Sequence, residues 1–314
     1  MQTVLGVTLP FFALVLFGYV AAARRWVPGE AVPAFNGFLL YFAVPALLFR
    51  FAASTPFAEI ANGRYFVAWG GCGIAIVLAV TFVARRMLHQ RLRDAAFYGL
   101  AAAVANAGFM GVPLLVALLG TRAAAPTILA IVADLVMVAS AGLVLAELDG
   151  ATRRGWRADV RDAALRIFLN PFLISMLLGA AFSGLEWKLV TPFAEIVKLL
   201  ADAAGPCALF AIGVSLVRPD APLRSPVLAL PVVVKLLVHP AAIWLVMAAA
   251  GIDEATRRVA VLVAALPSAG WVFIFATRYE ADAGRISATI LWTTALAFVT
   301  FSGLVLLLGV GSGP

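Results

Sequence analysis

The sequence has few charged residues and few residues of the kinds that bind metals or form disulfides. Of its 314 residues 12% are charged, two are cysteines and two are histidines. A soluble domain typically carries about 25% charged residues, so this composition argues against a soluble fold. His-Glu-x-x-His, Gly-x-Ser-x-Gly and acidic loop clusters are missing from the sequence, so common hydrolase motifs are absent. We therefore expect no enzymatic activity, metal or cofactor.

Apolar residues dominate instead, and they occur in long runs. They make up 64% of the chain, and the mean hydropathy is +1.04. A run of about 20 apolar residues crosses the hydrocarbon core of a bilayer as a helix. The sequence predicts an all-α polytopic membrane protein with ten spans, at residues 4–23, 32–53, 65–84, 95–119, 126–147, 165–182, 189–217, 226–250, 259–279 and 285–309.

The basic residues lie mainly in the connectors between these spans, and their distribution predicts the orientation. Alternate connectors carry fifteen Lys and Arg residues, whereas the opposite set carries five, namely Arg64, Arg122, Lys188, Arg257 and Arg258. Basic connectors remain in the cytoplasm, so both termini are predicted to be periplasmic in a bacterial inner membrane. The net charge of +7 is then a feature of topology, and no nucleic-acid partner is expected.

The two halves of the chain repeat each other. Pro45-Ala-Leu-Leu-Phe49 recurs as Pro206-Cys-Ala-Leu-Phe210, and Pro10-Phe-x₆-Gly18 recurs as Pro171-Phe-x₆-Gly179, both at an offset of 161 residues. Five spans per copy would place the second copy upside down in the membrane. We predict a first five-helix repeat at 1–148, a cytoplasmic linker at 149–164 and a second, inverted repeat at 165–314. Inverted repeats are typical of alternating-access transporters.

Glycine and proline interrupt the fourth and ninth spans at matching positions. The fourth contains Asn106, Gly108 and Pro113, and the ninth contains Pro267-Ser268-Ala269-Gly270. These residues weaken a helical backbone, so we predict broken helices that cross at the midplane and offer their N-termini to an anion. An ordinary kink in each helix is the alternative.

Three polar residues are predicted at a similar depth, within very roughly 5 Å: Asn106, Asp134 in the fifth span and Lys235 in the eighth. Intramembrane charges are costly and usually functional. Asp134 is predicted to bind substrate or carry a proton, and Lys235 to be a counter-ion for Asp134 or substrate, or a structural partner. His239 is expected to pack or bond a carbonyl. Glu195, Lys198 and Asp202 are expected to form an ion-pair chain on one helix face, and Arg50 to extend its side chain to the membrane surface.

The segments around Asn106–Pro113 and Ala264–Pro267, together with the Pro45 and Lys235–Pro240 segments, resemble the auxin efflux carrier (PIN-FORMED) family over nearly the whole chain. The resemblance implies an elevator-like carrier of organic anions, a homodimer, and an Asn106 that faces substrate. Asp134 falls where plant members carry glutamine, and an acidic residue there would repel a carboxylate unless protonated or paired. The long cytoplasmic loop of plant members is missing.

The sequence thus predicts a secondary transporter of mono- or dicarboxylates, malonate- or auxin-like, embedded in membrane lipid, with Asp134 providing proton coupling. Its predicted substrate-binding residues are Asn106, Gly108, Pro113, Asp134, Pro267, Ser268 and Gly270, with Asp134 and Lys235 as coupling or counter-ion residues. A sodium-coupled symporter is the alternative; an intramembrane enzyme or a sensory protein is disfavoured.

Overall fold

The computed structural model describes residues 2–54, 56, 62–149, 171–215 and 225–309, and these are helical apart from short connections and one isolated bridge. The helices of the first half are α1 (Gln2–Ala23), η1 (Gly29–Ala31), α2 (Val32–Phe38), η2 (Leu39–Ala43), α3 (Val44–Ser54), α5 (Gly63–Arg86), α6 (Leu92–Ala103), η3 (Ala107–Gly111), α7 (Val112–Leu119), η4 (Thr121–Ala123), α8 (Ala124–Ala133), η5 (Asp134–Val138) and α9 (Ala139–Leu148). Those of the second half are α11 (Pro171–Gly184), α12 (Thr191–Ser215), α13 (Pro226–Val233), η6 (Val234–Val238), α14 (His239–Ala249), α15 (Glu254–Ala264), α16 (Trp271–Arg278) and α17 (Ala283–Leu307). Helices cover most of the described part of each predicted span, and the spans at 95–119 and 259–279 are interrupted after Ala103 and after Ala264. The predicted linker lies outside the described residues except for Asp149.

Continuous helical stretches among the described residues are long and apolar enough to cross a membrane. Five qualify by length and composition: Gly29–Ser54, Gly63–Arg86, Thr121–Leu148, Pro226–Ala249 and Ala283–Leu307. Shorter apolar helices accompany them at Ala13–Ala23, Ala107–Leu119 and Ile174–Gly184. Large apolar side chains such as Phe82 and Leu307 are exposed on the outside of the bundle, which is where lipid would cover them. The chain is a polytopic membrane protein.

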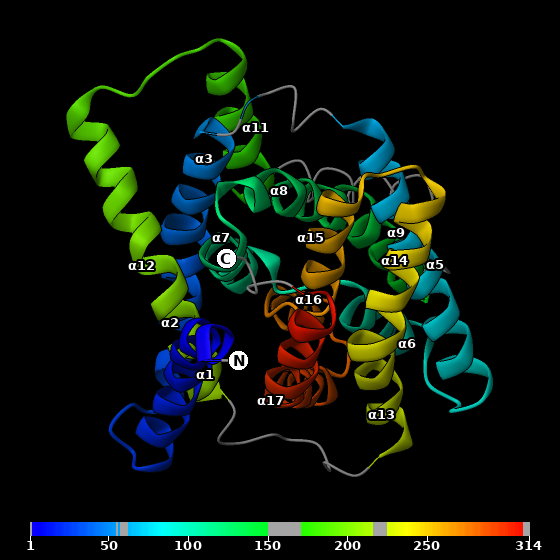
Figure 1. The fold of residues 1–314 in the computed structure, drawn as a ribbon. Helices are drawn as coiled ribbons and strands as arrows, with labels where there is room; N and C mark the ends of the chain where they lie inside the picture. The colour runs from blue at the N-terminus through cyan, green and yellow to red at the C-terminus, as the bar shows by residue number, and fades with distance from the viewer. Residues whose placement is uncertain (1, 55, 57–61, 150–170, 216–224, 310–314) are drawn as a thin grey trace.

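One group of helices, which we call the outer bundle, consists of α1, α2, α3, α11 and α12 (Figure 1). In it α1 packs along α12, and α3 packs between α11 and α12. Glycines bring these pairs together, because a Cβ atom at Gly18 of α1 would collide with the backbone carbonyl of Phe210. A Cβ atom at Gly179 of α11 would likewise lie 2.6 Å from the carbonyl oxygen of Phe49 in α3. Small residues at helix contacts are typical of membrane packing.

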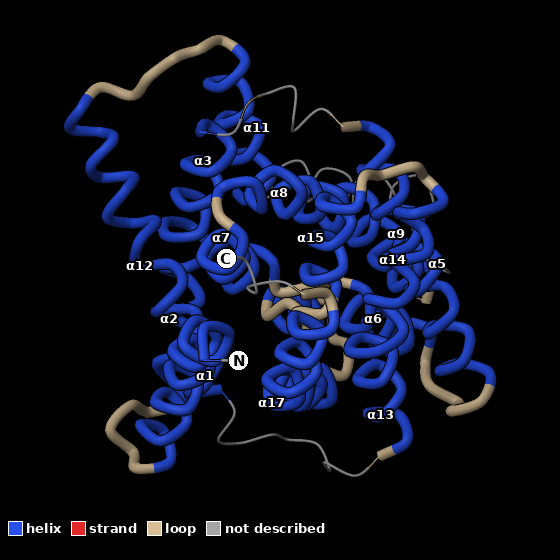
Figure 2. Tube along the Cα trace, viewed as in Figure 1, coloured by secondary structure: helices blue, strands red, loops and turns tan. Residues whose placement is uncertain are grey.

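The remaining helices, α5 to α9 and α13 to α17, form the interrupted core. Its helix starts are capped by short polar side chains: Asn62 accepts a hydrogen bond from the Tyr65 amide at the start of α5, and Asp282 accepts one from the Arg285 amide at the start of α17. Such caps satisfy amide groups that have no partner within the helix. The two predicted interruptions lie at the centre of this core, where Figure 2 shows loop segments surrounded by helices.

One side-chain prediction made from helical spacing was wrong, and Arg50 has a partner that the sequence did not indicate. Asp202 does not continue the chain of Glu195 and Lys198; it accepts a hydrogen bond from Arg50 at 2.7 Å across the α3–α12 contact. Arg50 is therefore paired with a neighbouring helix and does not simply extend to the membrane surface. The Lys198–Glu195 pair is present at 3.8 Å. Spacing along one helix identified the polar face, but it could not identify the partner on the adjacent helix.

Candidate functional site

The two interruptions meet through backbone hydrogen bonds at the centre of the core. Helix α6 ends at Ala103 and helix α15 at Ala264, and an isolated antiparallel bridge joins Ala105 to Ser268. The Asn106 amide donates to the Pro267 carbonyl at 2.8 Å, and the Ala269 amide donates to the Val104 carbonyl at 3.2 Å. These bonds satisfy backbone groups that the broken helices release, which is a requirement for non-helical backbone at membrane depth.

Ser268 holds the crossing in place and does not face an open site. Its Oγ donates to the Ala101 carbonyl at 2.6 Å, and its amide donates to Thr293 Oγ1 at 3.1 Å. The side chain is fully buried. Ser268 therefore links the second interruption to α6 and α17, and in this conformation its hydroxyl is already used within the protein.

Beside the crossing lies a small cavity of about 20 Å³, which is room for roughly one water molecule. Three predicted site residues line it: Asn106, Gly108 and Asp134. Pro113, Pro267, Ser268, Gly270 and Lys235 do not. The sequence analysis missed the other lining residues, which are Val44, Leu48, Ala105, Phe109, Ile131, Leu135, Ala269 and Trp271. Most of these are apolar and gave no signal in the sequence, because they resemble any core residue.

Two oxygen atoms at the cavity are buried without a hydrogen-bond partner among the described residues. They are Asn106 Oδ1 and Asp134 Oδ2, on side chains that are 2% and 3% exposed. An unpaired buried polar atom costs roughly 1–3 kcal/mol, more when charged. A buried polar atom without a partner needs an explanation, and a bound water, ion or ligand is one of them.

Asp134 is positioned from the opposite side by an aromatic residue. Trp69 of α5 donates its indole N–H to Asp134 Oδ1 at 2.7 Å, and Tyr65, one turn earlier, stacks on Trp69 with ring centroids 6.0 Å apart. Asp134 begins η5, a stretch of π-helical turn. Such turns are rare and frequent at functional sites. The sequence analysis read Trp69 as part of an apolar span, since a tryptophan there has no distinguishing pattern.

Lys235 lies behind Asp134 and outside the cavity lining. It is fully buried in the π-helical turn η6, where its Nζ donates to the Ala264 carbonyl at 2.9 Å and lies 3.0 Å from Nδ1 of His239. The charges of Lys235 and Asp134 interact, but the two side chains form no direct ion pair. The counter-ion role of Lys235 therefore stays a prediction. His239 bonds Lys235 and not a carbonyl, and its ring meets Trp69 edge to face at 5.7 Å.

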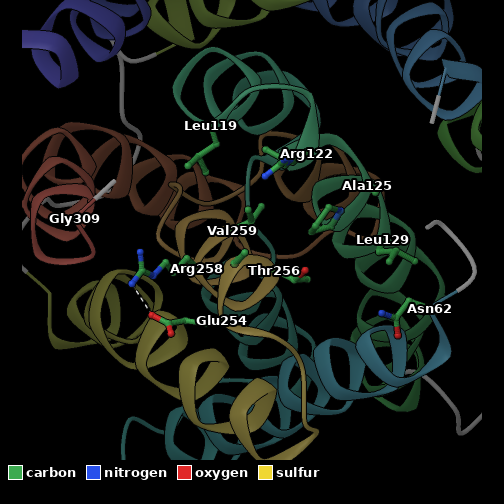
Figure 3. A pocket seen from close by; sticks show the side chains of 13 residues that line it. Asn62, Leu119, Arg122, Ala125, Leu129, Glu254, Thr256, Arg258, Val259 and Gly309 are labelled. Carbon is green, nitrogen blue, oxygen red and sulfur yellow. Dashed lines mark hydrogen bonds and ion pairs between the residues drawn. The ribbon is translucent and has the colours of Figure 1, made fainter. Parts of the chain in front are cut away.

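A wider pocket of about 780 Å³ opens where α7 ends and α8 and α15 begin. Figure 3 shows Arg122 and the ion-paired Arg258 and Glu254 around it, together with the lining residues Leu129 and Val259. Helix α8 lines both this pocket, through Leu129, and the small cavity, through Ile131. The pocket is separate from the predicted site, and no sequence motif indicated it.

A network of hydrogen bonds and ion pairs joins the start of α6 to the start of α17; we call it the network that closes the core. Asp94 accepts from Arg91 Nε at 2.8 Å and from the Asp282 amide at 2.9 Å. Arg285 donates to the Tyr98 hydroxyl at 3.2 Å and pairs with Asp282 at 2.9 Å. Hydrogen bonding to Asp94 raises the pKa of the Arg91 guanidinium, which therefore remains charged at any physiological pH.

Comparison with known proteins agrees with this architecture. A family model described as "Membrane transport protein" matches residues 3–305. A protein of Rhizobium meliloti (strain 1021) named "Putative malonate transporter" is 32% identical over 316 residues, covering 100% of this chain and 98% of that protein. "Uncharacterized transporter YfdV" of Escherichia coli (strain K12) is 25% identical, with 94% of each chain covered. "Lysosomal cholesterol signaling protein" of Mus musculus is 24% identical over 247 residues, which are 74% of this chain and 28% of that protein.

Proposed function

The chain belongs to the membrane transport protein family, that of the auxin efflux carriers, and we propose that it is a secondary active transporter of small organic anions. Transporter membership places it outside the enzymes. The proposed substrates are mono- or dicarboxylates of malonate-like size, and the proposed coupling ion is the proton. The name of the Rhizobium meliloti relative is consistent with a dicarboxylate.

The observation that carries this proposal is the crossing of two interrupted helices beside two buried oxygen atoms, Asn106 Oδ1 and Asp134 Oδ2, that have no hydrogen-bond partner among the described residues. The N-terminal ends of two helical segments lie at the cavity. Gly108, near the start of η3, and Trp271, the first residue of α16, both line it. Helix N-termini favour anions, and a broken-helix crossing near the midplane is the usual binding site in inverted-repeat carriers. Asn106, Gly108 and Asp134 are the residues we propose to contact the substrate.

The outer bundle supports the proposed inverted repeats at 1–148 and 165–314. Gly18 and Gly179 are equivalent at an offset of 161 residues, as are Phe49 and Phe210. The contact of Gly18 with the Phe210 carbonyl in the α1–α12 pair therefore has its counterpart in the contact of Gly179 with the Phe49 carbonyl in the α11–α3 pair. Each half supplies one helix to each pair, as a two-fold relation between the halves requires. Alternating access by exchange of the two halves' roles follows.

We favour a proton over sodium as the coupling ion because Lys235 already supplies a cation beside Asp134. Its Nζ also donates a hydrogen bond to the Ala264 carbonyl, so this oxygen is not free to coordinate a sodium ion. The periplasmic placement of both termini and the homodimer remain predictions from the charge distribution and the family resemblance.

The test is uptake of radiolabelled malonate into proteoliposomes, with and without a pH gradient and with and without sodium. We expect the pH gradient to drive uptake and sodium to have no effect. Asp134→Asn should abolish the response to the pH gradient, whereas Asp149→Asn, at the exposed end of α9, should leave it unchanged. Uptake that equals that of empty liposomes under all conditions would refute the proposal for malonate, and a sodium-dependent uptake would favour the symporter alternative.

A further inference from the structure

Asp134, Lys235 and His239 form one buried cluster, which we call the charge cluster, and only Asp134 reaches the small cavity. Lys235 and His239 are one helical turn apart, and Nζ of Lys235 lies 3.0 Å from Nδ1 of His239. Nε2 of His239 is buried and has no hydrogen-bond partner in the described part of the chain. Asp134 is therefore the member of the cluster that a substrate in the small cavity would contact.

The geometry limits the protons that this cluster can hold. The ammonium form of lysine has donors and no acceptor, so with Lys235 charged its Nζ, 3.0 Å from Nδ1 of His239, can only donate to that nitrogen, which is then unprotonated. The remaining proton of His239 is on Nε2, so the imidazole is neutral. A second positive charge on His239 would lie next to Lys235 without water or a carboxylate to compensate it, which is strongly unfavourable in a buried site. His239 therefore serves as an acceptor and takes up no proton.

We infer that the charge cluster takes up a single proton when one carboxylate of a substrate molecule enters the cavity, and releases it when the substrate leaves. This inference rests on the proposed function. In the empty site the Asp134–Lys235 pair is neutral overall. A carboxylate adds one negative charge, and one proton from water restores neutrality, because Asp134 is then protonated while Lys235 remains an ammonium group. A buried site that stays neutral avoids the cost of an uncompensated charge.

In the described part of the chain, no other charged group faces the cluster closely enough to change this proton count. Helix α5 contributes Tyr65 and Trp69, and α15 contributes the Ala264 carbonyl. Helices α6 and α17 also pack against η6, and α9 packs against η5. Their charged residues lie near the helix ends: Arg93 and Asp94 at the start of α6, Arg285 at the start of α17 and Glu147 at the end of α9. A monocarboxylate would thus cross without net charge, and a dicarboxylate would carry one negative charge.

The experiment is calorimetric titration of the purified protein with malonate in buffers of different ionisation enthalpy, which counts the protons taken up on binding. We expect one proton per malonate for the natural protein, and an affinity that falls about tenfold per pH unit where that proton must come from water. Asp134→Asn should bind malonate with no proton uptake and with a flat pH profile. Two protons, or none, in the natural protein would overturn the inference.

Variants of His239 test its role as a neutral acceptor. His239→Asn keeps an acceptor near the position of Nδ1 and should retain most of the affinity, whereas His239→Leu should lower it about tenfold or more. Both should still take up one proton. Loss of proton uptake in His239→Leu would make His239 the proton carrier and overturn the assignment. His89→Asn, outside the core, is the matched control, and thermal unfolding of each variant identifies any that misfold.

The two proposals fail in different ways. Malonate binding and uptake with a proton count other than one would overturn the single-proton inference and leave the transporter proposal intact. A protein that neither binds nor transports malonate would remove the proposed substrate, and the inference with it.

Discussion

The outer bundle and the interrupted core solve different physical problems with the same apolar composition. In the outer bundle, helices approach closely at Gly18, Gly179 and Gly213, and its described ion pairs, including Arg50–Asp202, are at least partly exposed. In the interrupted core, the helices break, and Asp134, Lys235 and His239 are buried within them. Close glycine contacts give a rigid frame at low cost, whereas broken helices and buried charges are expensive and are retained where they do chemistry. The difference assigns rigidity to the first region and binding to the second.

The largest effect on stability is expected in the outer bundle. Gly213→Val would drive a side chain into the backbone of α1, at the Val15 carbonyl and Gly18, and we expect a loss of about 3 kcal/mol or more because neither backbone can move freely. Thermal unfolding in detergent measures this. Gly71→Val, at a position on α5 with open space around it, is the control. Equal losses in both variants would contradict a close contact at Gly213.

In the core, a change at the cavity should affect ligand and not stability. Asn106→Ala removes a side chain whose Oδ1 is unpaired, so we expect little change in unfolding temperature. Malonate affinity should fall by about 1–3 kcal/mol, or roughly tenfold to a hundredfold. Calorimetry gives the affinity. Asn62→Ala, which removes only the cap of α5, should leave affinity unchanged, and a loss of affinity there equal to that of Asn106→Ala would weaken the cavity assignment.

The closed end of the core should depend on Asp94. Asp94→Asn keeps the shape of the side chain but removes the charge that holds Arg91 and weakens the bond from the Asp282 amide. We expect a loss of about 1–3 kcal/mol in the free energy of unfolding. Chemical or thermal unfolding in detergent measures it. Glu30→Gln, at an exposed carboxylate of η1 in the first half of the chain, provides the comparison, and a negligible effect of Asp94→Asn would mean that the network does not stabilise the core.

The smallest effect is expected at the start of α15, where Asp253 accepts a hydrogen bond from the Thr256 amide at 3.0 Å. Asp253→Ala should cost about 1 kcal/mol, the usual contribution of an N-cap. Backbone hydrogen bonds lower the pKa of Asp253, so the ionised carboxylate stabilises the folded state. That contribution is present above the ordinary aspartate pKa of about 3.9 and is lost as pH falls through the lower folded value. Unfolding of the variant should therefore lack this acid-side decline.

Much of the interrupted core could be predicted from sequence because backbone chemistry is local. Gly108, Pro113 and the Pro267–Gly270 segment indicated breaks in otherwise apolar spans, and Asp134 was prominent as a carboxylate within hydrocarbon. The partners of these residues could not be predicted. Trp69 and His239 lie in spans with no distinguishing period, and Ser268, taken for a substrate ligand, bonds Ala101 instead. Side-chain partners across helices depend on rotation and depth, which no spacing along a single helix specifies.

The sequence by itself determined that the chain lies in lipid, where its helices lie and where two of them are interrupted, because these follow from hydropathy and from the local limits that glycine and proline set on the backbone. Only the tertiary structure decided that the interruptions bond each other through Ala105 and Ser268, and that Lys235 is held behind Asp134, away from the cavity. Those outcomes depend on hydrogen bonds between different segments, such as the one from Lys235 to the Ala264 carbonyl, and such contacts exist only once the helices have packed.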